Sequence, residues 1–197
     1  EIASCLVGSE MCIRDRVMPE DAPALRQETL LRLGAQIRHS PARSGVNGAR
    51  RLAAQTAAAN GWYYMDWLAN DDNPEYHRRV TGPAIVQSIA REGKSAVDAI
   101  VIGVGSGGTV TGVGETIKAW TNDVRIVAVE PYENQVLGGG LTGPHGIPDI
   151  GYGIVPENYN SYVVDNVSAV ASRDAQRAAQ QVLRTDAIPA SVSAGAA

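Results

Sequence analysis

The stretch VDAIVIGVGSGGTVTG, residues 97–112, decides the fold. Residues 97–104 form an almost wholly apolar run, which is typical of a strand buried on both faces of a parallel sheet. The glycine-rich loop of residues 103–112 follows and leads into a predicted helix. Glycine lets the backbone approach a ligand closely, and the free N–H groups at a helix N-terminus favour an anion. The stretch therefore predicts a buried strand, an anion-binding loop and a helix in succession.

Strands and helices alternate on both sides of this stretch. The alternation predicts an α/β fold, a three-layer αβα arrangement around a mainly parallel sheet. Asn73 and Pro74 are interpreted as the cap and first turn of a helix, with a kink or break at Gly82-Pro83. Residues 131–160, rich in Gly, Pro and Asn, are expected to be a long functional loop region. The predicted strands are 35–40, 62–65, 97–104, 124–130, 167–170 and 188–192, and the predicted helices are 23–33, 47–59, 73–92, one from the glycine loop to about 120, and 172–184.

The composition excludes several classes of protein. With 44% hydrophobic and 19% charged residues among 197, the chain can bury a core and is not disordered. The net charge of −4, without a basic block, argues against nucleic acid as the main partner. No apolar run reaches the roughly 20 residues of a membrane span. Cys5 and Cys12 make neither a disulfide framework nor a metal site with the scattered histidines, so we expect no metal and a cytoplasmic location.

The glycine loop leaves two kinds of phosphate ligand open. Gly103, Gly105 and Gly108 match G-x-G-x-x-G, and Glu130 closes the next predicted strand, as in a dinucleotide-binding fold where an acid meets the ribose. The hydroxyls of Ser106 and the threonines beside it instead suit a terminal phosphate monoester. A nucleoside-triphosphatase loop is excluded because no Gly-Lys-Ser/Thr follows the glycines.

Several motifs together resemble those of cysteine synthases and cystathionine β-synthases, pyridoxal-phosphate enzymes of fold type II. GVGSGGTVTGVG looks like the phosphate loop of that family. Similar segments occur in the same order: VMPEDAPALRQETLLRLGAQI (17–37), NPEYHRRVTGP (73–83), VAVEP (127–131), GPHGIPDIGYGIVPEN (143–158) and SVSAGAA (191–197). The resemblance covers residues 17–197 and implies an internal fragment of such an enzyme, with an amino acid as substrate and a homodimer as the complete protein.

The resemblance also implies a division of the chain. Residues 17–66 are expected to form a partial N-terminal α/β sub-domain, and residues 67–197 a truncated C-terminal cofactor-binding domain. Residues 1–16 have no clear period, and SEMCIRDR resembles translated sequencing-adaptor sequence, so this segment is interpreted as a non-native leader.

Site residues follow from the same resemblance. Ser193 matches the serine that meets the pyridine nitrogen, or else caps a helix. Tyr152 looks more like cystathionine β-synthase, while Asp149 replaces a glycine of cysteine synthases and Trp67 lies near a usual glutamine. The phosphate-binding residues are expected to be Gly105, Ser106, Gly107, Gly108 and Thr109, and the substrate side to include Gly151 and Tyr152.

Other polar residues receive structural interpretations. His77 and His145 are expected to be hydrogen-bonded structural residues. The pair Arg78-Arg79 is expected to be a solvated helix face, and Asp71-Asp72 a solvated turn.

The family's Schiff-base lysine is expected upstream of the Met-Pro-Glu segment. Lys94 and Lys118 are the only lysines, both expected to be exposed, and neither matches the family position. We therefore expect β-replacement of O-acetylserine by sulfide in the complete protein, and no activity from this chain alone. The alternatives are cystathionine β-synthase, with serine and homocysteine, a dinucleotide-binding module, and a catalytically dead binding protein.

Overall fold

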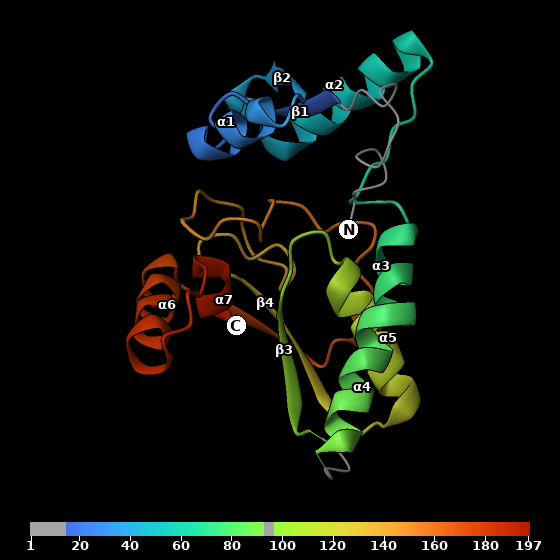
Figure 1. Cartoon of the computed structure of the whole chain (residues 1–197), viewed down its shortest axis with the longest axis vertical. Helices are drawn as coiled ribbons and strands as arrows, with labels where there is room; N and C mark the ends of the chain where they lie inside the picture. The colour runs from blue at the N-terminus through green and yellow to red at the C-terminus, as the bar shows by residue number, and fades with distance from the viewer. Residues whose placement is uncertain (1–14, 93–96) are drawn as a thin grey trace. The chain divides into compact units, whose positions relative to one another are not determined.

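The computed structural model describes residues 15–92 and 97–197, which divide into two compact units at the Asp66–Trp67 bond. Each unit is an α/β structure with parallel strand pairing, drawn in Figure 1. Most of the predicted leader lies outside the described residues, as does Lys94. Asp15 and Arg16, the last two residues of that segment, begin the first strand.

The N-terminal unit has a two-stranded parallel sheet of β1 (Asp15–Pro19) and β2 (Gln36–Ser40), paired from Asp15↔Gln36 to Pro19↔Ser40. The helices are α1 (Ala24–Arg32), the short 3₁₀ helix η1 (Ala42–Ser44) and α2 (Gly45–Asn60). Gly61 ends α2 in the left-handed conformation, at φ 66°, as expected for a glycine C-cap.

The strand predicted over residues 62–65 is wrong, because this segment is irregular. Trp62 still belongs to the helix end, since its N–H donates to the Ala57 carbonyl (2.9 Å). Tyr63 is 78% exposed. Aromatic residues favour strands only where a neighbouring strand can pair with them, and β1–β2 is the whole sheet of this unit among the described residues.

The C-terminal unit has a three-stranded parallel sheet in the order β3 (Ala99–Gly103), β4 (Arg125–Pro131), β5 (Asn166–Val170). Figure 1 shows α3, α4 and α5 on one side of this sheet and α6 and α7 on the other. The helices after the first strand are α5 (Gly108–Trp120), α6 (Ser172–Asp186) and α7 (Val192–Ala196), with a 3₁₀ turn, η3, at Ser161–Val163. The three-layer α/β expectation is confirmed.

The strand predicted over residues 188–192 is also wrong. Ala187 ends α6 in the left-handed conformation (φ 54°), and the chain then runs irregularly into α7. Ser191 begins that helix by accepting a hydrogen bond from the Ala194 N–H (3.1 Å). A serine before a short run of small residues favours the start of a helix. This preference outweighs the tendency of the apolar residues around Ile188 to form a strand.

The predicted helix 73–92 is observed as three consecutive helical pieces: α3 (Asp72–Tyr76), a π-helical turn, η2 (His77–Thr81), and α4 (Gly82–Arg91). Gly82 itself is helical (φ −60°, ψ −53°), so the chain does not break there. Pro83 has no N–H to bond the carbonyl four residues earlier, and the wider turn lies just before it. The irregularity therefore falls one turn before the predicted kink.

Two hydrophobic clusters cover the sheet of the C-terminal unit. One joins Ile126 and Ala128 of β4 to buried residues of α5. The other joins Val129 to Ala175 of α6 and Ala196 of α7. Alternate residues of β4 thus enter opposite clusters, which explains why this strand is an almost continuous apolar run.

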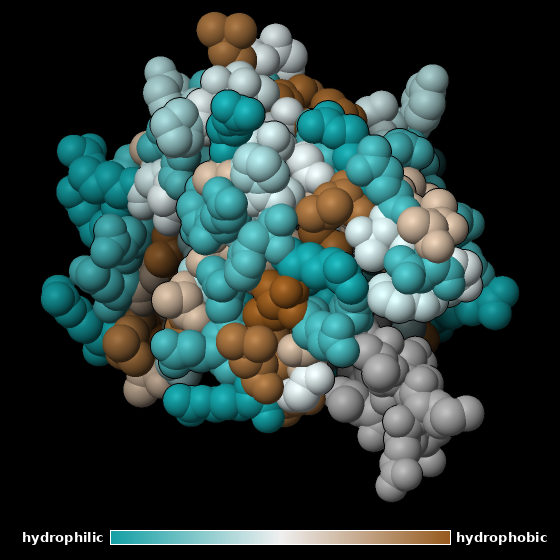
Figure 2. Space-filling view, turned by 90° about the horizontal axis from the view of Figure 1, so that it is seen from above, coloured by the Kyte–Doolittle hydropathy of each residue, from teal (hydrophilic) through white to brown (hydrophobic). Residues whose placement is uncertain are grey.

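Figure 2 shows one face of the molecule, where hydrophobic side chains are interspersed among hydrophilic ones. Large apolar residues at the surface include Leu25 and Leu31 of α1 and Leu33, which follows that helix. In the described ranges, no helix has both the length and the apolar character that crossing a bilayer requires.

Candidate cofactor site

The glycine-rich loop connects the end of β3 to the start of α5. It is tied to the sheet at Val104, whose N–H donates to the Val129 carbonyl (3.0 Å). The Val104 carbonyl accepts from the Gly151 N–H (3.1 Å), so the loop and the 149–153 segment lie side by side. Gly107 has φ +82°, a left-handed conformation that a residue with a Cβ adopts at a cost.

Three of the loop glycines are also required by close packing. A Cβ on Gly105 would lie 2.3 Å from the Asp149 carbonyl oxygen, and one on Gly108 would lie 2.0 Å from Oδ1 of Asn73. A Cβ on Gly107 would lie 2.9 Å from the backbone nitrogen of Tyr159. Packing alone therefore accounts for the absence of side chains on one side of the loop.

The loop's hydrogen-bond donors point to a further role. Within the described part of the chain, the N–H groups of Gly105, Ser106, Gly107 and Thr109 donate to no other group of the protein. Four neighbouring N–H donors, at the N-terminus of a 13-residue helix, form the kind of cradle that binds phosphate.

Two hydroxyls of the loop are held from α3 and the π-helical turn. Asn73 Nδ2 donates to Ser106 Oγ (2.9 Å), and His77 Nε2 is 3.1 Å from Thr109 Oγ1. Asn73 lies inside α3 and does not cap it, so that prediction is wrong. His77 is hydrogen-bonded on both ring nitrogens, as expected for a structural histidine, but one of its partners is a predicted phosphate-binding residue.

The 149–153 segment supplies the predicted substrate side. Asp149 (φ 67°) and Gly151 (φ 63°) both have left-handed backbones, so the segment is tightly turned. The Gly151 carbonyl accepts from His145 Nε2 (2.7 Å), and His145 Nδ1 accepts from the Ile147 N–H, which fixes the ring's tautomer. His145 is thus hydrogen-bonded within its own loop, as expected.

Tyr152 packs edge-to-face against Trp67, with ring centroids 6.5 Å apart. The same tyrosine ring lies near the loop, 3.6 Å from where a Cβ on Gly105 would be. The structure therefore brings Tyr152, the predicted substrate-side aromatic residue, close to the predicted phosphate cradle.

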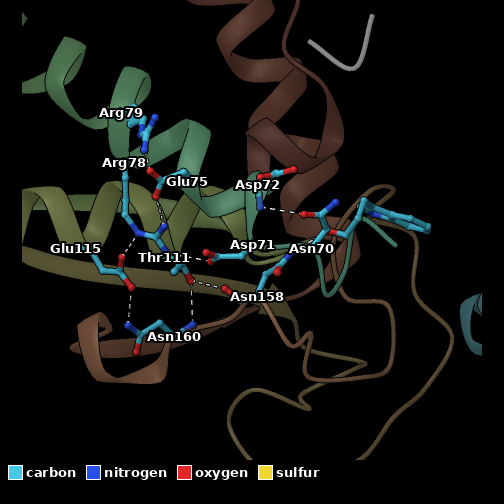
Figure 3. A network of polar contacts seen from close by, with 11 residues as sticks. Asn70, Asp71, Asp72, Glu75, Arg78, Arg79, Thr111, Glu115, Asn158 and Asn160 are labelled. Carbon is cyan, nitrogen blue, oxygen red and sulfur yellow. Dashed lines mark hydrogen bonds and ion pairs between the residues drawn. The ribbon is translucent and has the colours of Figure 1, made fainter. Parts of the chain in front are cut away.

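A polar network holds the flank of α5 (Figure 3). Arg78 bonds three carboxylates, those of Glu115, Glu75 and Asp71. The Glu115 carboxylate, followed by that of Glu75, raises the pKa of the Arg78 guanidinium. The expected solvated face is therefore wrong for Arg78, while Arg79 is exposed as expected.

The same network reaches the residues that back the loop. Thr111 Oγ1 donates to the Asn158 carbonyl (2.6 Å) and accepts from the Asn160 N–H (2.9 Å). The Asn160 side chain donates to Glu115 (2.8 Å). Since Tyr159 lies against Gly107, these bonds fix the surface on which the loop rests.

Comparison with known proteins identifies the family. The model of the pyridoxal-phosphate dependent enzymes matches residues 8–197. The chain belongs to this family. The cysteine synthase of Staphylococcus aureus (strain N315) is 34% identical over 180 residues, which are 91% of this chain and 57% of that protein. The chain thus spans just over half the length of the curated relatives it matches.

Solved structures that cover 92–93% of the chain share its fold. Cysteine synthase from Entamoeba histolytica has a TM-score of 0.83 at 32% identity, covering 93% of this chain and 53% of that one. O-ureido-L-serine synthase has a TM-score of 0.88 at 30% identity, with 92% and 57% covered. An O-acetylserine dependent cystathionine β-synthase from Helicobacter pylori has 0.85 at 27%, with 93% and 58% covered. The expected family, fold type and cofactor are therefore confirmed.

Ser193 lies inside α7, so the helix-cap interpretation of this residue is wrong. The cap is Ser191, whose Oγ is 2.9 Å from Ser193 Oγ. Among the described residues, no hydrogen bond joins Ser193 to the glycine-rich loop. Its connection to the site is through packing, because Ala196 of the same helix shares a cluster with Ile150, and Ile150 lies against Gly103.

Glu130, the acid of the dinucleotide alternative, is buried at the end of β4. Its carboxylate accepts hydrogen bonds from the Leu137 N–H (2.8 Å) and the Gly138 N–H (3.0 Å). Both carboxylate oxygens of Glu130 therefore hold the loop that contains Leu137 and Gly138.

Lys118 is not the exposed lysine that the sequence suggested. Its Nζ bonds both oxygens of Asp165 (2.7 and 3.0 Å) and the Val124 carbonyl (2.9 Å). It lies nine residues along α5 from Thr109, about 14 Å at the helical rise. This lysine therefore anchors the far end of α5.

The sequence analysis did not assign Asn73, Asn158 or Tyr159 to the site. Asn73 stands in the Asn-Pro motif, which predicted a helix cap and gave no indication of its hydrogen bond to Ser106. Asn158 and Tyr159 lie in the region 131–160. Its length predicted a functional loop but did not indicate which of its residues contact the glycine-rich loop.

Proposed function

We propose that this chain is the cofactor-holding part of a cysteine synthase-like enzyme, which replaces the β-acetoxy group of O-acetylserine by sulfide to give cysteine and acetate. The observation that carries the proposal is the set of loop N–H groups, those of Gly105, Ser106, Gly107 and Thr109, that donate to no other described part of the chain. Such donors bind a phosphate monoester without a nearby cation. No lysine or arginine is needed in the loop.

Each residue then has a defined task. The N–H groups of residues 105–109 and the hydroxyls of Ser106 and Thr109 hold the phosphate group. Ser193 would present a neutral hydroxyl to the pyridine nitrogen, and this hydroxyl would not stabilise the protonated nitrogen as a carboxylate would. Bound pyridoxal phosphate supplies an electron sink for the α-carbon of an amino acid, and with a neutral partner this sink is mild, which favours β-elimination. Gly151 and Tyr152 line the amino-acid side.

A second candidate is a cystathionine β-synthase activity with serine and homocysteine. Tyr152 favours it, because a larger aromatic surface beside Trp67 suits a longer sulfur substrate. Competition between sulfide and homocysteine in the complete protein decides between the two.

The catalytic lysine is proposed to lie outside this chain, which alone is then inactive. Lys118 supports this, because its Nζ is bonded to Asp165 at the far end of α5. The complete protein is proposed to be a cytoplasmic homodimer. Sedimentation and fractionation of the complete protein test these two statements.

The test is the affinity of the full chain for pyridoxal phosphate, measured by equilibrium dialysis. We expect pyridoxal, which lacks the phosphate, to bind at least about 10-fold more weakly, since hydrogen bonds to a charged group contribute about 1.5–3 kcal/mol each. Ser106→Ala and Thr109→Val should each weaken binding by about 10-fold for the same reason. Thr185→Val, which removes an exposed helical hydroxyl, is the control. Equal binding of pyridoxal and its phosphate contradicts the proposal.

A further inference from the structure

Two polar residues on one helical segment bond the two hydroxyls of the phosphate loop. Asn73 and His77 are four positions apart, so they project from the same side of the segment. Their partners are three positions apart: Ser106 lies in the loop, and Thr109 lies in the first turn of α5. A Cβ on Gly112 would lie 2.6 Å from the Cβ of His77, so the two helical segments meet almost backbone to backbone.

The bond from Asn73 leaves the Ser106 proton free to be donated. Asn73 Nδ2 donates both to the Trp67 carbonyl (2.8 Å) and to Ser106 Oγ (2.9 Å). A carbonyl oxygen can only accept, so the Trp67 contact fixes which end of the amide faces Ser106. Ser106 Oγ is therefore an acceptor toward Asn73, and its own O–H remains available as a donor.

The orientation of the Thr109 hydroxyl depends on the tautomer of His77. The ring lies between Thr81 Oγ1 (2.9 Å from Nδ1) and Thr109 Oγ1 (3.1 Å from Nε2). Other helical threonines, such as Thr29 and Thr56, donate to the carbonyl four residues earlier. For Thr81, the partner found among the described residues is the His77 ring.

A Thr81 hydroxyl that donates to Nδ1, as Thr29 and Thr56 donate to the turn before them, leaves the proton of the neutral ring on Nε2. Burial lowers the pKa of His77 below its usual value, so the ring is neutral at pH 7 and above. Nε2–H then donates to Thr109 Oγ1, which leaves the threonine O–H free to be donated elsewhere.

We propose that Asn73 and His77 are positioning residues that direct the hydroxyl protons of Ser106 and Thr109 toward the phosphate group, with Thr81 selecting the tautomer of His77. This inference rests on the proposed function, since it assigns the ligand of the same loop. A phosphate dianion only accepts hydrogen bonds, so two hydroxyls already oriented as donors bind it better than two freely rotating ones.

The first test needs no cofactor. In the ¹⁵N-labelled full chain at pH 7.5, the ring nitrogen shifts of His77 should show a protonated Nε2 and a bare Nδ1. Thr81→Val should weaken this preference. A ring protonated on Nδ1, or on both nitrogens, overturns the proposal and leaves the phosphate assignment intact.

The second test is the affinity of His77 variants for pyridoxal phosphate. His77→Leu should bind about 3–10-fold more weakly, the loss of one neutral hydrogen bond. His77→Gln keeps an N–H donor near the position of Nε2 and should restore affinity to within about 2-fold of the native chain. His39→Leu, at an exposed histidine bonded to Gln27, is the matched control and should change nothing. Thermal unfolding of each variant confirms that it is folded.

The outcomes separate the two proposals. If His77→Gln binds as weakly as His77→Leu, the ring acts by packing and the positioning role is wrong. If both bind like the native chain while Ser106→Ala and Thr109→Val do not, the positioning role is wrong and the phosphate site stands. If these last two variants also bind normally, the phosphate assignment fails, and this inference fails with it.

Discussion

Replacing Gly107 by alanine tests why the phosphate loop has its shape. Gly107 has φ +82°, and a Cβ there would lie 2.9 Å from both the backbone nitrogen and Cα of Tyr159. Gly139 is a matched control in the same unit: its φ is +79°, and a Cβ there meets nothing within 4 Å. The two substitutions share the backbone penalty and differ in the steric one.

The magnitudes follow from these two terms. A left-handed alanine costs about 1–2 kcal/mol, which is the whole expected loss of unfolding free energy for Gly139→Ala. Crowding against a backbone that is itself fixed adds about 1–3 kcal/mol at Gly107. Tyr159 is fixed in this way, because the bonds of Thr111 to Asn158 and Asn160 hold both of its neighbours. Gly107→Ala should therefore cost about 2–5 kcal/mol in total.

Native-state hydrogen exchange of the β4 amides measures this cost, since they report on the C-terminal unit alone. Gly107→Ala should also weaken binding of pyridoxal phosphate, while Gly139→Ala should not. Equal losses of stability in the two variants would refute the reasoning, because they would mean that Tyr159 moves aside without cost.

Three further predictions concern polar groups away from the loop. The hydrogen bond from Lys118, and then that from the Ile126 N–H, lowers the pKa of Asp165. The stabilising effect of the ionised Asp165 is therefore complete at neutral pH and is lost as the pH falls below about 4. Asp165→Asn should flatten the pH dependence of thermal unfolding below this pH. Glu130→Ala should lower the unfolding free energy by about 1–3 kcal/mol in urea, because two loop amides lose their acceptor, without changing affinity for a nicotinamide dinucleotide. Arg50→Lys loses the two parallel hydrogen bonds to Asp66. It should lower the unfolding free energy of the N-terminal unit by about 1 kcal/mol, measured by urea unfolding.

The strand, loop and helix of residues 97–120 could be predicted from sequence because their signals are local. An apolar run followed by glycines and a helical pattern has few other structures available to it. The expected burial of this strand on both faces is wrong, because β3 lies at the edge of the described sheet and Val101 is 42% exposed. The bounds of β3 and β4 differ from prediction by a few residues at most. The predicted strands 62–65 and 188–192 failed because strand formation depends on a neighbour, which lies elsewhere in the sequence.

The polar partners of the loop could not be predicted because they are distant along the chain. Asn73 reaches Ser106 across 33 residues, and its position in an Asn-Pro motif gave it a sufficient local interpretation as a cap. Arg78 likewise reads as a solvated charge until α5 brings Glu115 beside it, 37 residues away. Long-range bonds of this kind leave no periodic signal in one sequence.

Gly112 of α5 and Gly82 of α4 have a mechanical consequence. A Cβ on Gly112 would lie 2.3 Å from the Pro74 carbonyl oxygen, and one on Gly82 would lie 2.6 Å from the Thr116 side chain. Because no side chain separates the two backbones at these contacts, there is little room for α5 to shift or rotate against α3 and α4. We therefore expect α5 and the helical segments packed against it to move together as one body.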